Sequence, residues 1–252
     1  MPEIPDSILL DEPPTVAKGS GSARQVLHWY DFLCPFCYVG QQRNTIFKSH
    51  GFEVIDIPFE AHPEIPPEGR AIGERSGPMY AHIEEEARTA GLPLAWPERL
   101  PNTRMALAAA EWTRRHVPQS FRALEKALFA AHFALGEDLG DRDIIDAHAA
   151  EAGIDVAAMH AALDAGSAYA LVDQSERLAK SLSVPGTPAW FVSGRLIPGL
   201  YPREQFEQLA QALTTVNDGS AKIPTRRPTS AEAPSVEAAF GNAACLIAKE
   251  HP

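Results

Sequence analysis

The sequence predicts an α/β fold in which a long helical block interrupts a smaller unit that contains strands. Three observations lead to this prediction. Residues 24–59 have the pattern of strand, helix and strand, residues 77–181 are helical in pattern almost throughout, and a strand hairpin with a helix returns after residue 184. With 252 residues, the chain is long enough for two domains or for one domain with a large insertion.

The first unit follows a predicted leader. Residues 1–22 carry four prolines and a GSGS run, a composition typical of an extended segment. The sequence QVLHWYDFL after Arg24 is rich in β-branched and aromatic residues and predicts a buried strand. The next helix should begin at CPFC, because Pro35 suits a first helical turn, and should stop at Gly51. FEVIDIPF at 52–59 predicts a second strand, and this order implies a right-handed parallel crossover.

The helical block follows a loop rich in Pro and Glu at residues 63–69. An Ala-rich run predicts a helix over 103–116. Residues suited to helix ends predict two more helices, one from Ser120 to Gly136 and one from Asp141 to Gly153.

The last folded segment starts with AWFV and RLIPG, which predict a hairpin that turns at Ser193 and Gly194. A final helix is expected over 202–213, followed by a linker and at best one marginal helix over 236–250. The predicted organisation is a flexible leader (1–22), a strand-containing domain in two pieces (23–65 and 182–214), an inserted helical domain (66–181), and a linker with a C-terminal tail (215–252).

Charge and composition exclude several classes of function. The chain has 22 Lys and Arg against 33 Asp and Glu, and its net charge of -11 repels phosphate backbones and anionic lipids. The N-terminal sequence lacks the basic region and the apolar run of an export signal. No apolar stretch approaches the ~20 residues that cross a bilayer. We therefore expect a cytoplasmic protein that binds neither nucleic acid nor membranes.

The chemistry predicted by the sequence centres on Cys34 and Cys37. Disulfide exchange needs a thiolate that attacks and a second thiol within reach, and CPFC at a helix start supplies both. The positive end of the helix dipole favours the thiolate of Cys34, whereas Cys37, one turn further, should be more buried and less acidic. This assigns Cys34 as the nucleophile and Cys37 as the resolving thiol. Pro35 fixes the helix start, and Phe36 offers an apolar edge to a partner.

Two other interpretations of the cysteines remain open. In the first, the pair forms half of a tetrahedral zinc site, but the sequence has no second CxxC and no closely spaced His pair to complete such a site. The pair also fits two buried core cysteines, although a Pro-Phe spacer between a strand and a helix is unusual for a core run. We predict no bound metal and no cofactor.

A second motif, Gly186-Thr187-Pro188, lies about 150 residues after the cysteines and directly before the predicted strand AWFV. In a chain that also carries CPFC, it indicates a candidate cis proline that leaves backbone groups free to pair with a substrate. The alternative is an ordinary trans proline in a turn.

Together, DFLCPFCYVG (31–40) and VPGTPAWFV (184–192) resemble the DsbA-like family, and most closely its cytosolic FrnE-type branch. An Asp three residues before the first Cys, a Tyr after the second, a helical insertion and NTR at 102–104 are similar to that branch. The resemblance implies a thioredoxin-like fold interrupted by an all-helical domain. It also implies catalytic roles for Cys34 and Cys37, and substrate binding by Thr187 and Pro188 together with the Pro35-Phe36 spacer.

The spacer departs from the family pattern. Pro-Phe replaces the Pro-His of DsbA and the Pro-Trp common in FrnE-type sequences, so no imidazolium is available to stabilise the thiolate. The helix dipole and backbone amides must stabilise the thiolate instead.

The expected cytosolic location favours a reductase or isomerase over a net oxidant.

The resulting expectation is a thiol–disulfide oxidoreductase or isomerase that acts on protein thiols, with glutathione as a redox partner and a monomeric or homodimeric state. Two alternatives are a glutathione-dependent isomerase or transferase of the same fold acting on a small aromatic substrate, and a non-catalytic peptide-binding module or holdase.

Near the cysteines, His28 is a candidate proton acceptor or a structural residue. Asp31 is a candidate tuning charge or a helix cap.

Overall fold

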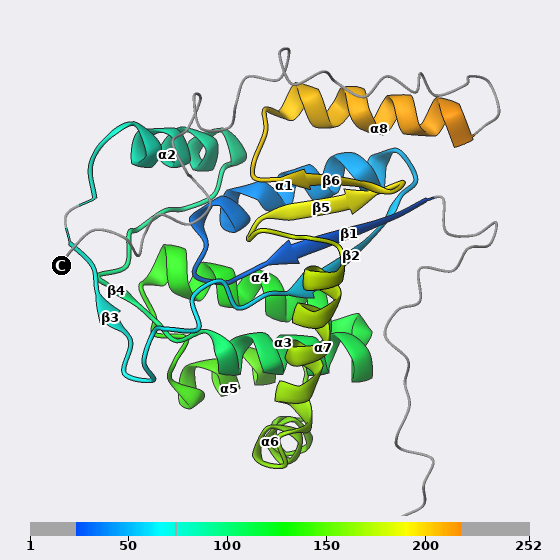
Figure 1. The fold of residues 1–252 in the computed structure, drawn as a ribbon. Coiled ribbons are helices and arrows are strands. Elements are labelled where there is room, and N and C mark those ends of the chain that lie inside the picture. Colours follow the sequence, from blue (N-terminus) through cyan, green and yellow to red (C-terminus); the bar gives the residue numbers. More distant parts are fainter. Residues whose placement is uncertain (1–23, 74, 218–252) are drawn as a thin grey trace, which may run out of the picture.

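The computed structural model describes residues 24–73 and 75–217, and its centre is a four-stranded mixed sheet in the order β2-β1-β5-β6 (Figure 1). β1 (Gln25–Tyr30) runs parallel to β2 (Glu53–Pro58) and antiparallel to β5 (Ala189–Val192). β6 (Arg195–Pro198) forms the edge of the sheet and pairs with β5 in the predicted hairpin. The fold is α/β, as predicted.

Two helices cover one face of the sheet. α1 (Pro35–Ser49) links β1 to β2, and α8 (Arg203–Asn217) follows β6 and packs on α1 (Figure 1). Successive side chains of a strand point to opposite faces. Val26 and Trp190 accordingly belong to a core with Phe47 of α1 and Phe206 of α8. Trp29 belongs to a second core with Ala179 of α7 (Ser167–Ser181).

The segment between β2 and β5 is mostly helical. Its helices are α2 (Pro78–Ala90), α3 (Arg104–His116), α4 (Pro118–Leu135), α5 (Arg142–Glu151), α6 (Val156–Asp164) and α7 (Ser167–Ser181). Helices α3 and α7 contact β2, so the insertion packs directly against the sheet. The insertion also contains a short antiparallel pair of two-residue strands, β3 (Arg70–Ala71) and β4 (Arg99–Leu100). It is therefore not entirely helical, and strands this short leave no periodic pattern in a sequence.

Several helix ends agree with the sequence prediction. The Asp141 side chain accepts a hydrogen bond from the Asp143 amide at the start of α5, and Gly136 ends α4 in the left-handed conformation. Ser120 does not begin α4, because Pro118 occupies the first turn and Val117 is the N-cap. The last helix is longer than predicted and continues to Asn217, three residues into the expected linker.

Two predicted segments lie outside the described residues, namely the leader at 1–22 and most of the tail, including Cys245. Within the described residues, no helix is long and apolar enough to cross a membrane.

Candidate active site

The site begins where β1 ends and α1 starts. Cys34 is the N-cap residue of α1 in extended conformation, and Pro35 follows in the first turn. The Cys34 backbone oxygen accepts hydrogen bonds from the amides of Cys37 (3.0 Å) and Tyr38 (3.2 Å), which closes the first turn around the motif. Both cysteines are free thiols. The local sequence therefore places the first cysteine where the dipole of α1 stabilises an anion.

The second motif meets Cys34 in space. The Cys34 Sγ lies 3.4 Å from the backbone oxygen of Thr187, to which it donates a hydrogen bond, although 153 residues separate the two in sequence. The Thr187–Pro188 peptide bond is cis. The β1–β5 register produces this contact, because it pairs Trp29 with Ala189 and so brings Pro188 beside the loop that leads to Cys34.

The two thiols differ in acidity. Burial alone raises the pKa of Cys34, but the side chains of Cys37 and Thr187 and the backbone of Cys37 outweigh burial, so its pKa falls below the ordinary value. The pKa of Cys37 is well above its ordinary value because of burial and the adjacent Cys34 sulfur. The environment thus favours a thiolate on Cys34 and a protonated thiol on Cys37.

Burial departs from the prediction. Cys37 is fully buried and Cys34 is 1% exposed, so the expected difference in burial between the two thiols is absent. Pro35, Thr187 and Pro188 are buried as well. Phe36 is partly exposed and rests against the core between α1 and the helical insertion. Of the predicted substrate-binding residues, Phe36 therefore offers the most surface to a partner.

Asp31 does not cap α1; instead its carboxylate ties three segments together. The carboxylate accepts hydrogen bonds from the Thr103 hydroxyl (2.7 Å), the Ala61 amide (2.8 Å) and the Leu33 amide (3.2 Å). Burial raises its pKa to about 6, against the effect of these hydrogen bonds. When ionised, its charge opposes ionisation of Cys34. The sequence singled out this residue, but two of its three partners, Ala61 and Thr103, come from distant segments.

His28 is part of a buried polar network. Its Nδ1 lies 2.6 Å from Asp56 Oδ1 and 3.0 Å from Asn44 Nδ2, and its ring stacks on Trp190 at 4.8 Å between centroids. The Trp190 indole donates to Asn44 Oδ1 over 2.7 Å. These contacts join β1, β2, β5 and α1, and they give His28 a structural role.

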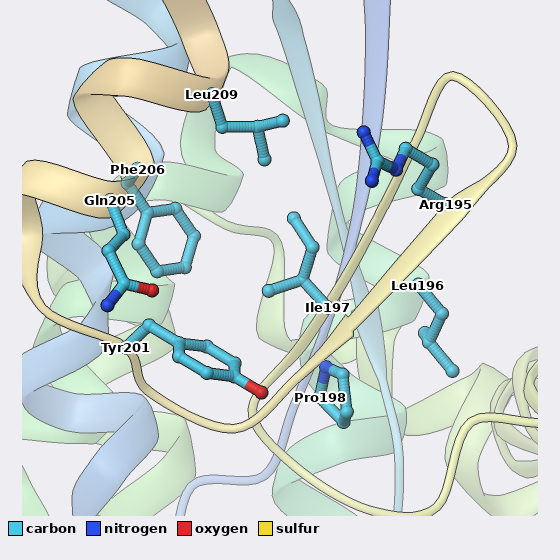
Figure 2. A pocket seen from close by; sticks show the side chains of 8 residues that line it. All are labelled: Arg195, Leu196, Ile197, Pro198, Tyr201, Gln205, Phe206 and Leu209. Atoms are coloured by element: carbon cyan, nitrogen blue, oxygen red, sulfur yellow. The ribbon is translucent and has the colours of Figure 1, made fainter. Parts of the chain in front are cut away.

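One cavity lies away from these residues and a smaller one lies beside Pro35. The larger, about 310 Å³, lies between β6 and α8; Figure 2 shows its apolar wall and Arg195 at one end. None of the site residues described above lines it. The smaller is a cleft beside Pro35 that also contains Arg75, Trp96 and His132. No pattern in the sequence predicts this cleft, because its walls come from segments that are far apart in the chain. No group of three or more His, Cys, Asp or Glu side chains within 24–73 and 75–217 is arranged to hold a metal ion.

The sequence of this chain is similar to those of known proteins. A family model described as "DSBA-like thioredoxin domain" covers residues 25–213. The uncharacterised protein YwbO of Bacillus subtilis (strain 168) is 26% identical over 188 residues, which are 71% of this chain and 91% of YwbO.

Solved structures share the fold. A probable DsbA oxidoreductase of Streptomyces coelicolor has a TM-score of 0.65 and 23% identity, over 84% of this chain and 97% of that one. A 2-hydroxychromene-2-carboxylate isomerase has a TM-score of 0.63 and 19% identity, over 79% of this chain and 100% of that one.

The sheet topology and the paired motifs define a thioredoxin-fold protein with a helical insertion. Because the family model spans most of the chain, the protein belongs to the DsbA-like thioredoxin domain family.

Proposed function

We propose that this protein is a thiol–disulfide oxidoreductase in which Cys34 is the nucleophile and Cys37 the resolving thiol. The observation that supports this most directly is the environment of the pair. Cys34 lies at the N-cap of α1 with a lowered pKa, and Cys37 lies one turn further with a raised pKa. A low pKa on the attacking thiol and a protonated resolving thiol are what stepwise exchange requires.

The reaction proceeds in two exchanges. The Cys34 thiolate attacks one sulfur of a substrate disulfide, forms a mixed disulfide and releases the other sulfur as a thiolate. Cys37 loses its proton and attacks the Cys34 sulfur, which breaks the mixed disulfide and releases the second thiolate. Two electrons pass to the substrate, protons convert its sulfurs to thiols, and the protein is left with a Cys34–Cys37 disulfide. The reverse sequence oxidises a dithiol.

The substrates we propose are protein thiols and disulfides in the cytoplasm, with reduction or isomerisation as the direction of reaction. Phe36 supplies partly exposed apolar surface beside the cysteines. The Thr187 backbone oxygen lies 3.4 Å from Cys34 Sγ, and we assign Thr187 and Pro188 to pairing with an extended substrate chain there. Asp31, Tyr38 and the NTR sequence at 102–104 support placement in the FrnE-type branch.

The test uses the full chain and variants that each replace one cysteine by serine. Their rates are compared in an insulin-reduction assay with a thiol reductant. Cys34→Ser should reduce the rate to the uncatalysed background, and Cys37→Ser should accumulate a covalent mixed disulfide with substrate, visible by mass spectrometry. Cys245→Ser is the matched control and should behave like the wild type. Full activity in the Cys34→Ser variant would refute the proposal. Turnover of a small aromatic acid together with an inactive insulin assay would favour the isomerase alternative.

A further inference from the structure

A small cleft is lined in part by the two residues that flank the proposed nucleophile in sequence. Leu33 and Pro35, the neighbours of Cys34 in sequence, form one of its walls. The other walls come from Ile72 and Arg75 after β3, from α2, from residues 96–100 leading into and including β4, and from the C-terminal end of α4. Figure 1 shows where these elements lie in the fold. The polar or aromatic groups that line the cleft are Arg75, Tyr80, Trp96, His132 and Phe133.

His132 is the first sign that the cleft binds a ligand. Its side chain is buried, with 1% of the residue exposed, and neither ring nitrogen has a hydrogen-bond partner among the described residues. Leaving a buried polar group unpaired is unfavourable. Burial lowers the pKa of His132 to about 4, with the Glu137 backbone acting in the opposite direction. At neutral pH the ring is therefore uncharged, and its one N–H makes no hydrogen bond of good geometry among the described residues.

Arg75 is the second sign. Its guanidinium lies over the Trp96 ring at 5.3 Å from the centroid, and the side chain is partly buried. No carboxylate of the described residues neighbours it closely enough to affect its pKa, which burial lowers. Most buried or partly buried arginines are paired. Within residues 24–73 and 75–217, the cleft therefore holds a positive charge with no carboxylate beside it, together with the imidazole of His132.

The aromatic wall of the cleft is held in place. The Trp96 indole donates to Glu84 Oε1 over 2.9 Å, and its ring meets Tyr80 edge-to-face at 5.2 Å. The Ala95 amide donates to the Phe133 carbonyl over 2.6 Å, which anchors the segment before Trp96 on α4. A rigid apolar wall excludes water and strengthens electrostatic contacts within the cleft.

We propose, on the basis of the function above, that this cleft binds the carboxylate of a low-molecular-weight thiol while the sulfur of that thiol reacts at Cys34. A carboxylate accepts hydrogen bonds only, so it suits one guanidinium and one imidazole N–H. The enclosed volume is about 10 Å³, room for one oxygen-sized group. One carboxylate oxygen enters, and the remainder of the molecule stays at the mouth, on the side of Pro35.

Burial of the nucleophile favours a small reaction partner. Cys34 is 1% exposed, so a folded protein reaches its sulfur only after local opening, whereas a small thiol needs little space. Anchoring the carboxylate holds the sulfur of the small molecule near Cys34 and raises its effective concentration. In the reducing cycle, such a thiol attacks the Cys34–Cys37 disulfide at Cys34, and Cys37 leaves as a thiolate that takes up a proton. A second small thiolate then attacks the sulfur of the first in this mixed disulfide, which releases Cys34 as a thiolate and forms a small disulfide. Two electrons pass from the two small thiols to the protein, and its dithiol is restored.

The test uses the reduced full-length protein and two small disulfides that differ in charge. Rates of protein oxidation are measured with 3,3′-dithiodipropionate, which carries carboxylates, and with bis(2-hydroxyethyl) disulfide, which is neutral. Arg75→Gln and His132→Phe should each lower the ratio of the carboxylate rate to the neutral rate by about tenfold, because each removes a donor to the anion. The rate with the neutral disulfide should stay at the wild-type value.

Arg195→Gln is the matched control, because Arg195 lines the other cavity and its loss changes the net charge equally. The control should keep the wild-type ratio. An equal fall of the ratio in Arg75→Gln and Arg195→Gln would indicate general electrostatics and overturn the carboxylate site. An unchanged ratio in Arg75→Gln would overturn it as well.

A binding experiment separates failure of this site from failure of the proposed function. The probe is 3-(methylthio)propionate, which has the carboxylate but no reactive sulfur, and the readout is the histidine ring signals in NMR spectra. We expect saturable shifts of the His132 signals, assigned with His132→Phe, in the wild type and their loss in Arg75→Gln. Such binding by a protein that reacts with neither disulfide would support the site and refute the oxidoreductase. Absence of binding would overturn the site even if exchange proceeds.

Discussion

The replacement Asp31→Asn tests how a buried carboxylate next to the redox pair affects both stability and the acidity of the thiol. Asparagine has the same shape but no charge. Asp31 is fully buried, and burial raises its pKa from 3.8 to about 6. The native state therefore holds the proton of Asp31 more tightly than the unfolded chain does.

The sign and size of the effect follow from proton linkage. A raised native pKa gives stability that is fully present below about pH 4 and is lost as the pH rises through about 6. The difference between the two pKa values corresponds to about 3 kcal/mol. In the variant this loss disappears, but one amide N–H now faces the Ala61 N–H, which costs about 1–3 kcal/mol at all pH values. The variant should therefore be about 1–3 kcal/mol less stable than the wild type at pH 4, and equal to it or up to about 2 kcal/mol more stable at pH 7.

The measurement is urea denaturation of wild type and variant at pH 4 and pH 7, with the cysteines kept reduced. The difference in unfolding free energy between the two proteins should change by about 3 kcal/mol between these pH values. Other titrating groups, such as Glu125 with its pKa of about 8, are present in both proteins and cancel in this difference. Glu207→Gln, an acid-to-amide change on the surface of α8, is the control and should show no such change.

Thiolate absorbance near 240 nm provides a second readout. Because the charge of Asp31 opposes ionisation of Cys34, the variant should have a lower Cys34 pKa than the wild type. A difference in stability that does not depend on pH, together with an unchanged Cys34 pKa, would show that Asp31 carries no raised pKa and that the reasoning is wrong.

Three further predictions concern stability and are measured by chemical denaturation. His132 has its pKa lowered to about 4, so the difference in unfolding free energy between the wild type and His132→Phe should shift by about 3 kcal/mol against the wild type as the pH falls from 6.5 through 4; a difference that stays constant over this range contradicts the assignment. Trp190→Phe should cost at least about 2 kcal/mol, because it leaves the Asn44 oxygen unpaired and opens a cavity; a neutral result contradicts the network. Gly69→Ala should cost more than Gly136→Ala, where strain alone costs about 1 kcal/mol, because a Cβ at residue 69 would lie 2.7 Å from a backbone oxygen of β4; equal costs contradict this.

Local sequence signals predicted most elements of the fold because their causes are local. Pro35 after Cys34 sets the start of α1, and Gly136 ends α4, since only a residue without Cβ adopts a positive φ without strain. Ser193 and Gly194 turn the β5–β6 hairpin with positive φ angles. The errors have local causes too. Pro118 is a better first helical residue than anything near Ser120, and the two-residue strands β3 and β4 are too short for a periodic pattern.

The site was only partly predictable. The spacing of CPFC and its place before a helix are sequence properties, so the sequence was sufficient to assign Cys34 and Cys37 as a candidate pair. The burial of Cys34 was not predictable, because it results from packing against segments far away in the chain. Asp31 was recognised as a candidate, but its raised pKa depends on burial, which no local pattern shows.

The main strands and helices, the pair of cysteines and the proline motif that accompanies them could all be predicted from the sequence. Which distant groups meet depends on how the chain packs. The β1–β5 register brings the Thr187 oxygen to 3.4 Å from Cys34, and segments far apart in the chain place Arg75 and His132 in one cleft beside Pro35. The physical reason is that propensities, caps and turns act over a few residues. Burial and electrostatic environment instead depend on every segment that packs around a group.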